Sequence, residues 1–397
     1  MPTRIPATIM RGGTSRAVFL DGRHLPANSA EREQIILEVF GSPDPRQIDG
    51  LGGADPLTSK LAIIDRPDPE MAAQADVVYT FGQVGIAEPR VDWHSLCGNI
   101  SAAVGLYAIE TGMVGAVEPV TTVRVFNTNL NRILHIDVQV EDGAPRERGT
   151  FAVPGVPGTG SEIVIDFATT AGATTGALMP TGQVMDTLAV DGIGPVQATL
   201  LDIGNAHVFI RAADVGLTGT ETAAQIDADE PLRHRLEAIR GAAAMRMNMI
   251  AGPAAAARTQ SPATPILALI AAPAGYRVHG SGQTIAQADV DVVARLQFMQ
   301  QTHKTYAGTS TVCTGVASRI AGTIVHEAAR PKSGTVLRIG HPAGVIETTS
   351  IVAHGHGGAE VRRATLGRTA RRIMDGTVYL PAWRSAQRHE TTSGREQ

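Results

Sequence analysis

Residues 97–112 read CGNISAAVGLYAIETG. From 100 to 109 the side chains are almost all apolar around the whole circumference of a helix, and Gly112 ends the run. A helix that is apolar on every side has to be buried. The small residues 97–99 then form the N-terminal end of a core helix, where unpaired backbone N–H groups can hold an anion.

The second half of the chain repeats this arrangement. Residues 308–315 read GTSTVCTG and open another apolar helix, which continues to Ile320. In each half, one cysteine is expected in a turn of small residues directly before the buried helix, Cys97 in the first half and Cys313 in the second. This pattern predicts a duplicated domain with an active site in the cleft between the two copies.

The length and composition fit two domains. The chain has 397 residues, of which 43% are hydrophobic and 18% charged, so it can form two compact cores. We expect an N-terminal domain over 1–189, a C-terminal domain over 190–381 and a polar tail over 382–397.

The segments around the two buried helices are predicted to be mostly strands. Alternating apolar residues bounded by turn residues indicate strands, and a capped apolar stripe indicates a helix. The predicted strands cover residues 5–10, 17–20, 61–64, 77–86, 123–126, 136–140, 198–203, 208–210 and 266–271. Further helices are expected at 29–40 and 230–249.

The composition excludes several classes of function. A net charge of −4 and 4% aromatic residues suit neither a phosphate backbone nor stacked bases. Arg4 and Arg11 interrupt the start of the chain where a signal peptide needs an apolar run, and the longest apolar run, at 266–272, cannot span a bilayer. We therefore expect a cytoplasmic protein that binds neither nucleic acid nor membranes. Two cysteines cannot form a disulfide framework, and no cluster with metal-ligand spacing appears, so we expect free thiols and no metal.

Lysine is scarce, and this draws attention to Lys60. Only Lys60, Lys304 and Lys332 occur among the 34 basic residues. Arginine keeps its proton in proteins, so work that requires a neutral amine falls to lysine. Lys60 lies between a glycine-rich turn and an apolar strand, where desolvation would lower its pKa as a general base requires. A solvated charge at the end of a strand is the alternative.

Cys97 is the second candidate for chemistry. The N-terminus of a helix stabilises a thiolate, and Gly98 lets a ligand approach the backbone. A buried cysteine that serves only as a small hydrophobic residue is the alternative.

Several residues are candidates for holding a carboxylate. The turn of Arg11, Gly12, Gly13, Thr14 and Ser15 offers a guanidinium, backbone donors and two hydroxyl groups. The remaining candidates are Ser59 beside the lysine, Gly98 and Asn99 at the helix start, and His341, which could equally be structural.

At these residues the chain resembles the PrpF family of isomerases, which has the diaminopimelate epimerase-like fold. The resemblance covers nearly the whole chain in order. The matching segments are MRGGTSRAVFL at 10–20, GSPDPRQIDGLGGADPLTSKLAII at 41–64, CGNISAAVG at 97–105, TVCTGVASRIAGTIV at 311–325, GHPAGV at 340–345 and TARRIMDGTVYLP at 369–381.

The resemblance implies an α+β fold of two similar domains, each a mostly antiparallel sheet curled around a central helix. It assigns proton transfer to Lys60 and Cys97 and implies no cofactor. Members isomerise 2-methylaconitate, methylitaconate, aconitate or 4-oxalomesaconate, so the expected partner is a small unsaturated polycarboxylate. Segment 41–60 looks more like the 4-oxalomesaconate tautomerases of aromatic compound degradation, which makes 4-oxalomesaconate the expected substrate. The alternatives are 2-methylaconitate, methylitaconate and aconitate.

Three departures from the family pattern bear on the substrate. Arg16 replaces a lysine, Ala17 a glycine, and Leu96 the asparagine usual before Cys-Gly-Asn. Two other functions stay open: an amino-acid epimerase with Cys97 and Cys313 as opposed acid and base, and a binding protein without catalysis. The sequence leaves the oligomeric state open, a homodimer included.

Overall fold

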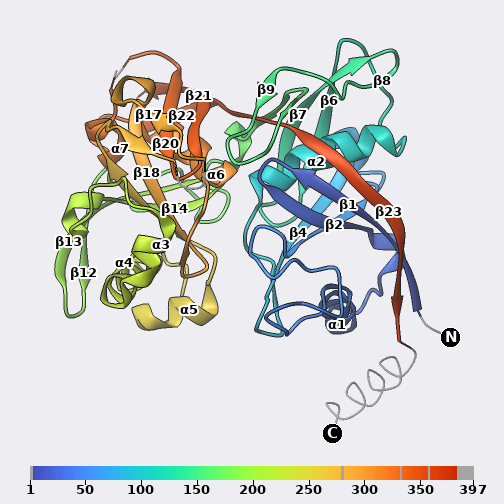
Figure 1. Cartoon of the computed structure of the whole chain (residues 1–397), viewed down its shortest axis with the longest axis horizontal. Helices are drawn as coiled ribbons and strands as arrows, with labels where there is room; N and C mark the ends of the chain where they lie inside the picture. The colour runs from blue at the N-terminus through green and yellow to red at the C-terminus, as the bar shows by residue number, and fades with distance from the viewer. Residues whose placement is uncertain (1–2, 279–280, 331–332, 356–357, 382–397) are drawn as a thin grey trace, which may run out of the picture.

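The computed structural model describes residues 3–278, 281–330, 333–355 and 358–381. Two halves lie side by side, and each is a mostly antiparallel sheet with one helix at its centre (Figure 1). The expected α+β fold of two similar parts is confirmed. The predicted tail over 382–397 lies outside the described residues.

Most elements of the first half are strands. They are β1 (Thr3–Gly12), β2 (Ser15–Asp21), β3 (Lys60–Asp65), β4 (Val77–Val84), β5 (Val91–Asp92), β6 (Val120–Asn127), β7 (Arg132–Glu141), β8 (Ala144–Pro145), β9 (Phe151–Ala152), β10 (Thr159–Gly160) and β11 (Ile163–Asp166). The α-helices are α1 (Ser29–Phe40) and α2 (Gly98–Glu110). The predicted strands over 5–10 and 17–20, which pair as a hairpin, and the predicted helix over 29–40 are confirmed.

The second half has the same character with more helices. Its strands are β12 (Asp186–Val190), β13 (Gly194–Ile203), β14 (Asn205–Arg211), β15 (Ile266–Ala271), β16 (Tyr276–Arg277), β17 (Thr284–Ile285), β18 (Val292–Phe298), β19 (Gln301–Thr302), β20 (Val336–His341), β21 (Gly344–Gly355), β22 (Gly358–Arg368) and β23 (Ala370–Leu380). Its α-helices are α3 (Ala223–Ala228), α4 (Glu230–Arg246), α5 (Ala257–Gln260), α6 (Gly308–Ala317) and α7 (Ile324–Ala328).

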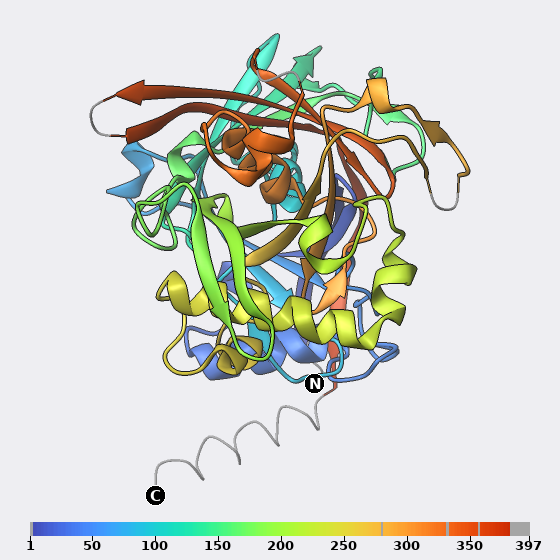
Figure 2. The same ribbon diagram turned by 90° about the vertical axis from the view of Figure 1, so that its left-hand side faces the viewer.

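The two halves share one order of strand pairing. A hairpin, β1–β2 or β13–β14, is followed by a strand parallel to its second member, β3 or β15. Next come an antiparallel neighbour, β4 or β18, a parallel one, β6 or β20, and a returning strand, β7 or β21. This common topology supports the duplication predicted from the sequence. The β21–β22 hairpin projects far from the second half (Figure 2).

Two strand pairings join the halves. β23 crosses over and lies antiparallel to β1, in the place that β12 takes beside β13 (Figure 1). β11 pairs with β7 on one side and with β22 on the other. The last strand of the chain is therefore part of the first half's sheet. The division at residue 189 stays a prediction.

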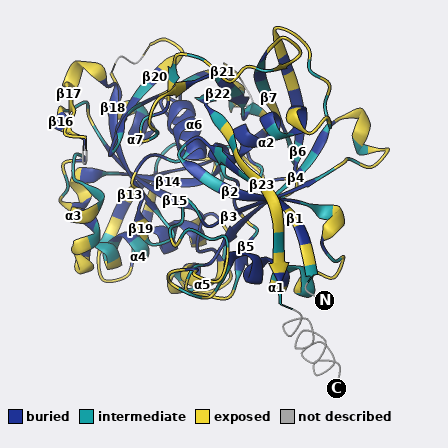
Figure 3. Ribbon diagram, turned by 45° about the vertical axis from the view of Figure 1, so that its right-hand side comes forward, coloured by how far each residue is buried: buried dark blue, intermediate teal, exposed yellow. Residues whose placement is uncertain are grey.

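Both central helices are buried, as predicted from their apolar sequences (Figure 3). Every residue of α6 is buried, and in α2 only Tyr107 and the terminal Glu110 reach solvent. Their helical stability comes from the sheets around them, since isolated helices of this length are marginal. The sheets thereby fix where each helix begins.

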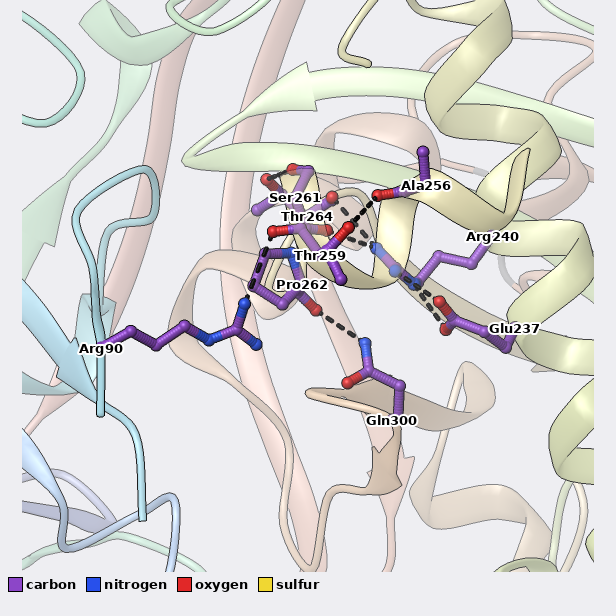
Figure 4. Close-up of polar contacts among 9 residues, drawn as sticks. All are labelled: Arg90, Glu237, Arg240, Ala256, Thr259, Ser261, Pro262, Thr264 and Gln300. Carbon is purple, nitrogen blue, oxygen red and sulfur yellow. Dashed lines mark hydrogen bonds and ion pairs between the residues drawn. The ribbon is translucent and has the colours of Figure 1, made fainter. Parts of the chain in front are cut away.

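Helix α5 and the loop between it and β15 form a further contact region between the halves (Figure 4). Arg240 of α4 is buried and donates hydrogen bonds to two carbonyl groups of the loop, 2.8 and 3.1 Å away. From the first half, the guanidinium of Arg90 lies 3.5 Å from the carbonyl oxygen of Thr259.

In the described part of the chain, no helix is both long and apolar enough to cross a membrane.

Candidate active site

The N-terminal ends of α2 and α6 meet between the two halves. An added Cβ on Gly98 would lie 3.0 Å from the backbone nitrogen of Thr309, and one on Gly308 would lie 3.2 Å from that of Asn99. Glycine at both positions permits this approach. Since a helix N-terminus carries partial positive charge and unpaired N–H groups, the junction favours an anionic ligand.

Cys97 is the N-cap residue of α2 and is partly exposed, as the sequence predicted for a thiol at the helix start. The second half holds the peptide before it in place. Asn205 accepts a hydrogen bond from the Leu96 N–H and donates one to the Leu96 carbonyl, both 2.9 Å long. Leu96 itself is buried, so the residue that replaces the family's usual asparagine packs into the core.

Lys60 opens β3, and its amine lies between the halves. The side chain is 4% exposed, and Nζ donates to Gln83 Oε1 at 2.6 Å. The rings of Phe81 and Phe298 lie 5.3 and 5.5 Å from Nζ. Burial lowers the pKa of Lys60, although the neighbouring Cys97 acts in the opposite sense. A lysine in this setting can lose its proton and act as a base.

The glycine turn packs directly on the start of α2. An added Cβ would lie 2.3 Å from the Asn99 carbonyl oxygen at Gly12 and 2.3 Å from Asn99 Oδ1 at Gly13, where φ is +49°. Two of the donors predicted to bind a carboxylate are already hydrogen-bonded within the protein. The Gly13 N–H donates to the Thr369 carbonyl at 2.9 Å, and Arg11 Nη1 donates to the same carbonyl at 2.9 Å.

Thr14 and Ser15 place their hydroxyl groups beside Asn99. Asn99 Nδ2 donates to Thr14 Oγ1 at 3.1 Å and to Ser15 Oγ at 3.4 Å. Thr14 Oγ1 also lies 3.2 Å from Thr305 Oγ1 of the second half. The turn and the helix start, which are far apart in sequence, therefore form one polar cluster with a residue of the second half.

Arg368, at the end of β22, belongs to the same cluster and was missed in the sequence. It is 2% exposed, and its Nε donates to Asn99 Oδ1 at 2.7 Å. No described carboxylate lies within ion-pair distance of it. Burial lowers the pKa of Arg368 to about 9, and the Cys97 thiol acts in the opposite sense. A buried guanidinium of this kind suits a substrate carboxylate. It also lines a cavity of about 510 Å³, to whose lining neither Lys60 nor Cys97 contributes.

His303 was also missed, and it faces Lys60 from the second half. Its Nδ1 accepts a hydrogen bond from the Thr305 N–H at 3.1 Å. Burial, and next the charge of Lys60, lower the pKa of His303 to about 4. The imidazole is neutral at pH 7, so it adds no positive charge that would oppose protonation of Lys60.

Two other predicted residues, Ser59 and His341, are buried. Ser59 is fully buried, donates to the Val84 carbonyl at 3.0 Å and accepts from Gln47 Nε2 at 2.9 Å. His341 is 1% exposed, and its Nε2 has no partner among the described residues. Burial, followed by the charge of Arg368, holds the pKa of His341 well below its usual range. A role of either residue in substrate binding stays a prediction.

The predicted position of Cys313 is wrong. The helix α6 begins at Gly308, so Cys313 lies inside it and is 0% exposed. Burial, and next Asp202, hold the pKa of its thiol well above the usual value. The small residues before Cys313 are the first turns of the helix rather than a turn preceding it. Ala307 occupies the N-cap position that Cys97 has in the first half.

The lysine is not duplicated either. Lys60 forms the first pair of the β2–β3 ladder, and Ile266 holds the same place in the β14–β15 ladder. The candidate chemistry is therefore confined to the first half, while the second half supplies Phe298, His303 and Arg368. Within the described residues, no three carboxylate, imidazole or thiol groups come together as a metal ion would require.

Residues 2–381 match the family model described as PrpF protein. The chain is 49% identical to the 3-methylitaconate isomerase of Eubacterium barkeri, over 95% of this chain and 97% of that protein. It is 38% identical to the 2-methyl-aconitate isomerase of Shewanella oneidensis, over 95% and 97% of the two chains. It is 37% identical to the 4-oxalomesaconate tautomerase of Pseudomonas putida, over 95% and 96%.

Solved structures agree with this grouping. A methylitaconate-delta-isomerase superposes with a TM-score of 0.79 at 48% identity, covering 96% of each chain. A hydroxyproline epimerase from Agrobacterium vitis, with a TM-score of 0.54, 12% identity and coverage of 95% and 93%, shares the fold. Since the family model spans nearly the whole described sequence and relatives well above 30% identity cover 95% of it, the chain belongs to the PrpF family and is an isomerase.

Proposed function

We propose that this isomerase moves a proton within a small unsaturated dicarboxylic acid of the 3-methylitaconate type, with Lys60 and Cys97 as the proton-transfer residues. The observation that carries the proposal is a buried lysine near a thiol that caps a helix at the point where two helix N-termini meet. The name of the relative at 49% identity supports the substrate type.

The reaction follows from the chemistry of such an acid. One of its carbons bears a carboxylate and lies next to a carbon–carbon double bond. The neutral Lys60 amine takes the proton from this carbon, and the electron pair of the broken C–H bond forms a new double bond. The electron pair of the original double bond accepts a proton from Cys97 at the carbon of that bond farther from the deprotonated carbon. A proton then passes from the Lys60 ammonium to the Cys97 thiolate, and both residues return to their starting state.

The negative charge that develops needs donors held in place beforehand. Arg368 is suited to bind one carboxylate, because its guanidinium is buried without a carboxylate partner among the described residues. The first N–H groups of α2, with the Thr14 and Thr305 hydroxyls, surround the same region. These groups support the binding of a dianion.

The order of candidate substrates differs from that expected from segment 41–60. That segment favoured 4-oxalomesaconate, but the relative named for this acid is 37% identical, against 49% for the 3-methylitaconate isomerase. We therefore place 3-methylitaconate first. Both 4-oxalomesaconate and 2-methylaconitate remain candidates, and each is the substrate in the name of a relative that covers the chain.

The proposal is tested by incubating the protein with 3-methylitaconate, 2-methylaconitate and 4-oxalomesaconate and following the vinyl and methyl signals by NMR. One acid should rearrange. Lys60→Arg should fold and lose turnover, because arginine stays protonated. Lys304→Arg, the same exchange at an exposed site, should keep it. Full activity of Lys60→Arg would contradict the role given to Lys60.

The epimerase with two opposed cysteines is disfavoured by the position of Cys313 inside α6. Cys313→Ala should keep the isomerisation, whereas Cys97→Ala should abolish it. Loss of turnover in Cys313→Ala with an unchanged circular dichroism spectrum would restore the two-cysteine mechanism. Binding of the acids without any rearrangement would instead indicate a protein that has lost catalysis.

A further inference from the structure

Gln83 faces Lys60 across the β3–β4 ladder. The two residues are direct partners in the antiparallel register, so their side chains project on the same face of the sheet. Gln83 is 2% exposed, and its Oε1 accepts the hydrogen bond from Lys60 Nζ at 2.6 Å. Gln83 is therefore the hydrogen-bond acceptor of the Lys60 amine.

The orientation of the Gln83 amide is fixed by its other end. Nε2 donates to the Ser59 carbonyl at 3.0 Å and to the Pro56 carbonyl at 3.2 Å. A carbonyl oxygen cannot donate, so the NH₂ group has to face these two atoms. The oxygen of the amide then has to face Lys60. Flipping the amide would break both bonds and place N–H groups against the amine.

We propose that Gln83 is a positioning residue for Lys60: its fixed, uncharged oxygen accepts one N–H bond of the amine and leaves the lone pair of the neutral amine for the substrate. A glutamate could accept the same bond from the amine, but it would lose the two bonds to the Ser59 and Pro56 carbonyls, and its negative charge would favour the ammonium form, which cannot take a proton. The inference rests on the proposed role of Lys60 as a base.

The other ionisable groups near Lys60 do not replace Gln83. Asp55 forms an ion pair with Lys304 at 2.6 Å, and Asp92 accepts from the His94 N–H at 2.9 Å. Both carboxylates therefore have other partners, and His303 is neutral at pH 7. The ionisable groups that act on Lys60 or on which it acts are Cys97 at the start of α2, Asp92 of β5, Asp55 in the loop before β3, and His303 after β19.

The decisive experiment reads the charge of Lys60 without substrate. The chain has three lysines, so the ¹³Cε signal of Lys60 can be resolved and assigned with Lys60→Arg and Lys304→Arg. In Gln83→Glu, the pKa of Lys60 should rise by about 1–3 units, because an opposite charge then lies in contact with the amine. Gln197→Glu adds the same charge at an exposed site on β13 and should leave the Lys60 titration unchanged.

The kinetic counterpart is a shift in the pH profile. The low-pH limb of kcat/KM should move upward in Gln83→Glu by the same amount, and activity should recover at pH values above the new limb. A role in folding alone would lower the rate at every pH. An unchanged Lys60 titration together with an unmoved limb would overturn the proposal.

A second variant covers the case that Gln83→Glu does not fold. Gln83→Met keeps the size and removes the acceptor, so kcat should fall at least about tenfold while KM changes little. An unchanged kcat would overturn the proposal. The NMR titration needs no substrate, so if none of the acids rearranges, the proposed function fails while the effect of Gln83 on Lys60 is still measured.

Discussion

Arg368 combines a buried charge with a planar group that recognises carboxylates. Arg368→Lys keeps the charge but cannot keep both the bond to Asn99 and a forked bond to the substrate. A hydrogen bond to a charged group contributes about 1.5–3 kcal/mol, so kcat/KM should fall about tenfold or more, mainly through KM. Arg146 lines the same cavity but is exposed, and Arg146→Lys serves as the control. Similar kinetics of the two variants would argue against a carboxylate at Arg368.

His207 should make the fold sensitive to acid. It is fully buried between the Asn205 carbonyl and Ser310 Oγ, both 2.8 Å away, and burial lowers its pKa from 6.5 to about 4. The unfolded chain therefore binds the proton first as the pH falls. The contribution of neutral His207 to the free energy of unfolding should be fully present above about pH 6.5. It should be lost as the pH falls to about 4, and the loss should be at most about 3 kcal/mol. Urea titrations of the wild type and His207→Gln should show a weaker pH dependence in the variant.

Some single residues of the candidate active site could be predicted from the sequence. Lysine scarcity singles out Lys60, and a buried helix with a small-residue start singles out Cys97. Nothing in the sequence distinguishes Arg368 from the other arginines, because its burial arises only when β22 is brought against the start of α2. His303 is equally hidden, since its contact with Lys60 spans the two halves.

Among the elements, the turn between β1 and β2 has a strict spatial requirement, because it packs against the backbone of α2. Gly12→Ala would place a methyl group 2.3 Å from the Asn99 carbonyl oxygen, which belongs to backbone that cannot move without shifting α2. Overpacking of this kind costs about 1–3 kcal/mol. An added Cβ on Gly115 meets nothing within 4 Å, so Gly115→Ala should change the free energy of unfolding by less than about 0.5 kcal/mol. Equal stability of the two variants in urea would disprove the steric argument.

The strands and buried helices were largely predictable, because their apolar periodicity is strong and turn residues mark their limits. Where a helix begins is harder to predict when its first turns consist of small polar residues. Residues 308–312 have the composition of a turn, yet they are buried and helical because the facing end of α2 and the surrounding sheet enclose them. The helix therefore begins several residues earlier than predicted, and Cys313 lies within it instead of before it.

For the whole molecule, the crossing of β23 makes the two halves depend on each other. Truncation after Thr369 would remove a strand that pairs with β1 along its whole length and would expose the backbone groups of β1. We expect this truncated chain to lose cooperative unfolding in a thermal scan. A chain ending at Pro381 keeps β23 and should unfold cooperatively. Indistinguishable melting of the two chains would show that β23 is dispensable.

The crossing of β23 into the sheet of the first half could not be predicted from the sequence. Strand pairing between residues 3 and 380 depends on the closure of the whole chain, and the pattern of β23 shows only that it is a strand. The near repetition of the two halves indicates a duplication, but it does not say which half receives the last strand.

The same crossing has a consequence for chain connectivity. Thr3 and Leu380 are partners in the β1–β23 ladder, so a short linker could join the two ends, and the chain could be reopened between β22 and β23. In such a circular permutant, β23 would precede β1 just as β12 precedes β13. The order of elements along the gene would become a plain tandem repeat, with one half of the molecule encoded after the other.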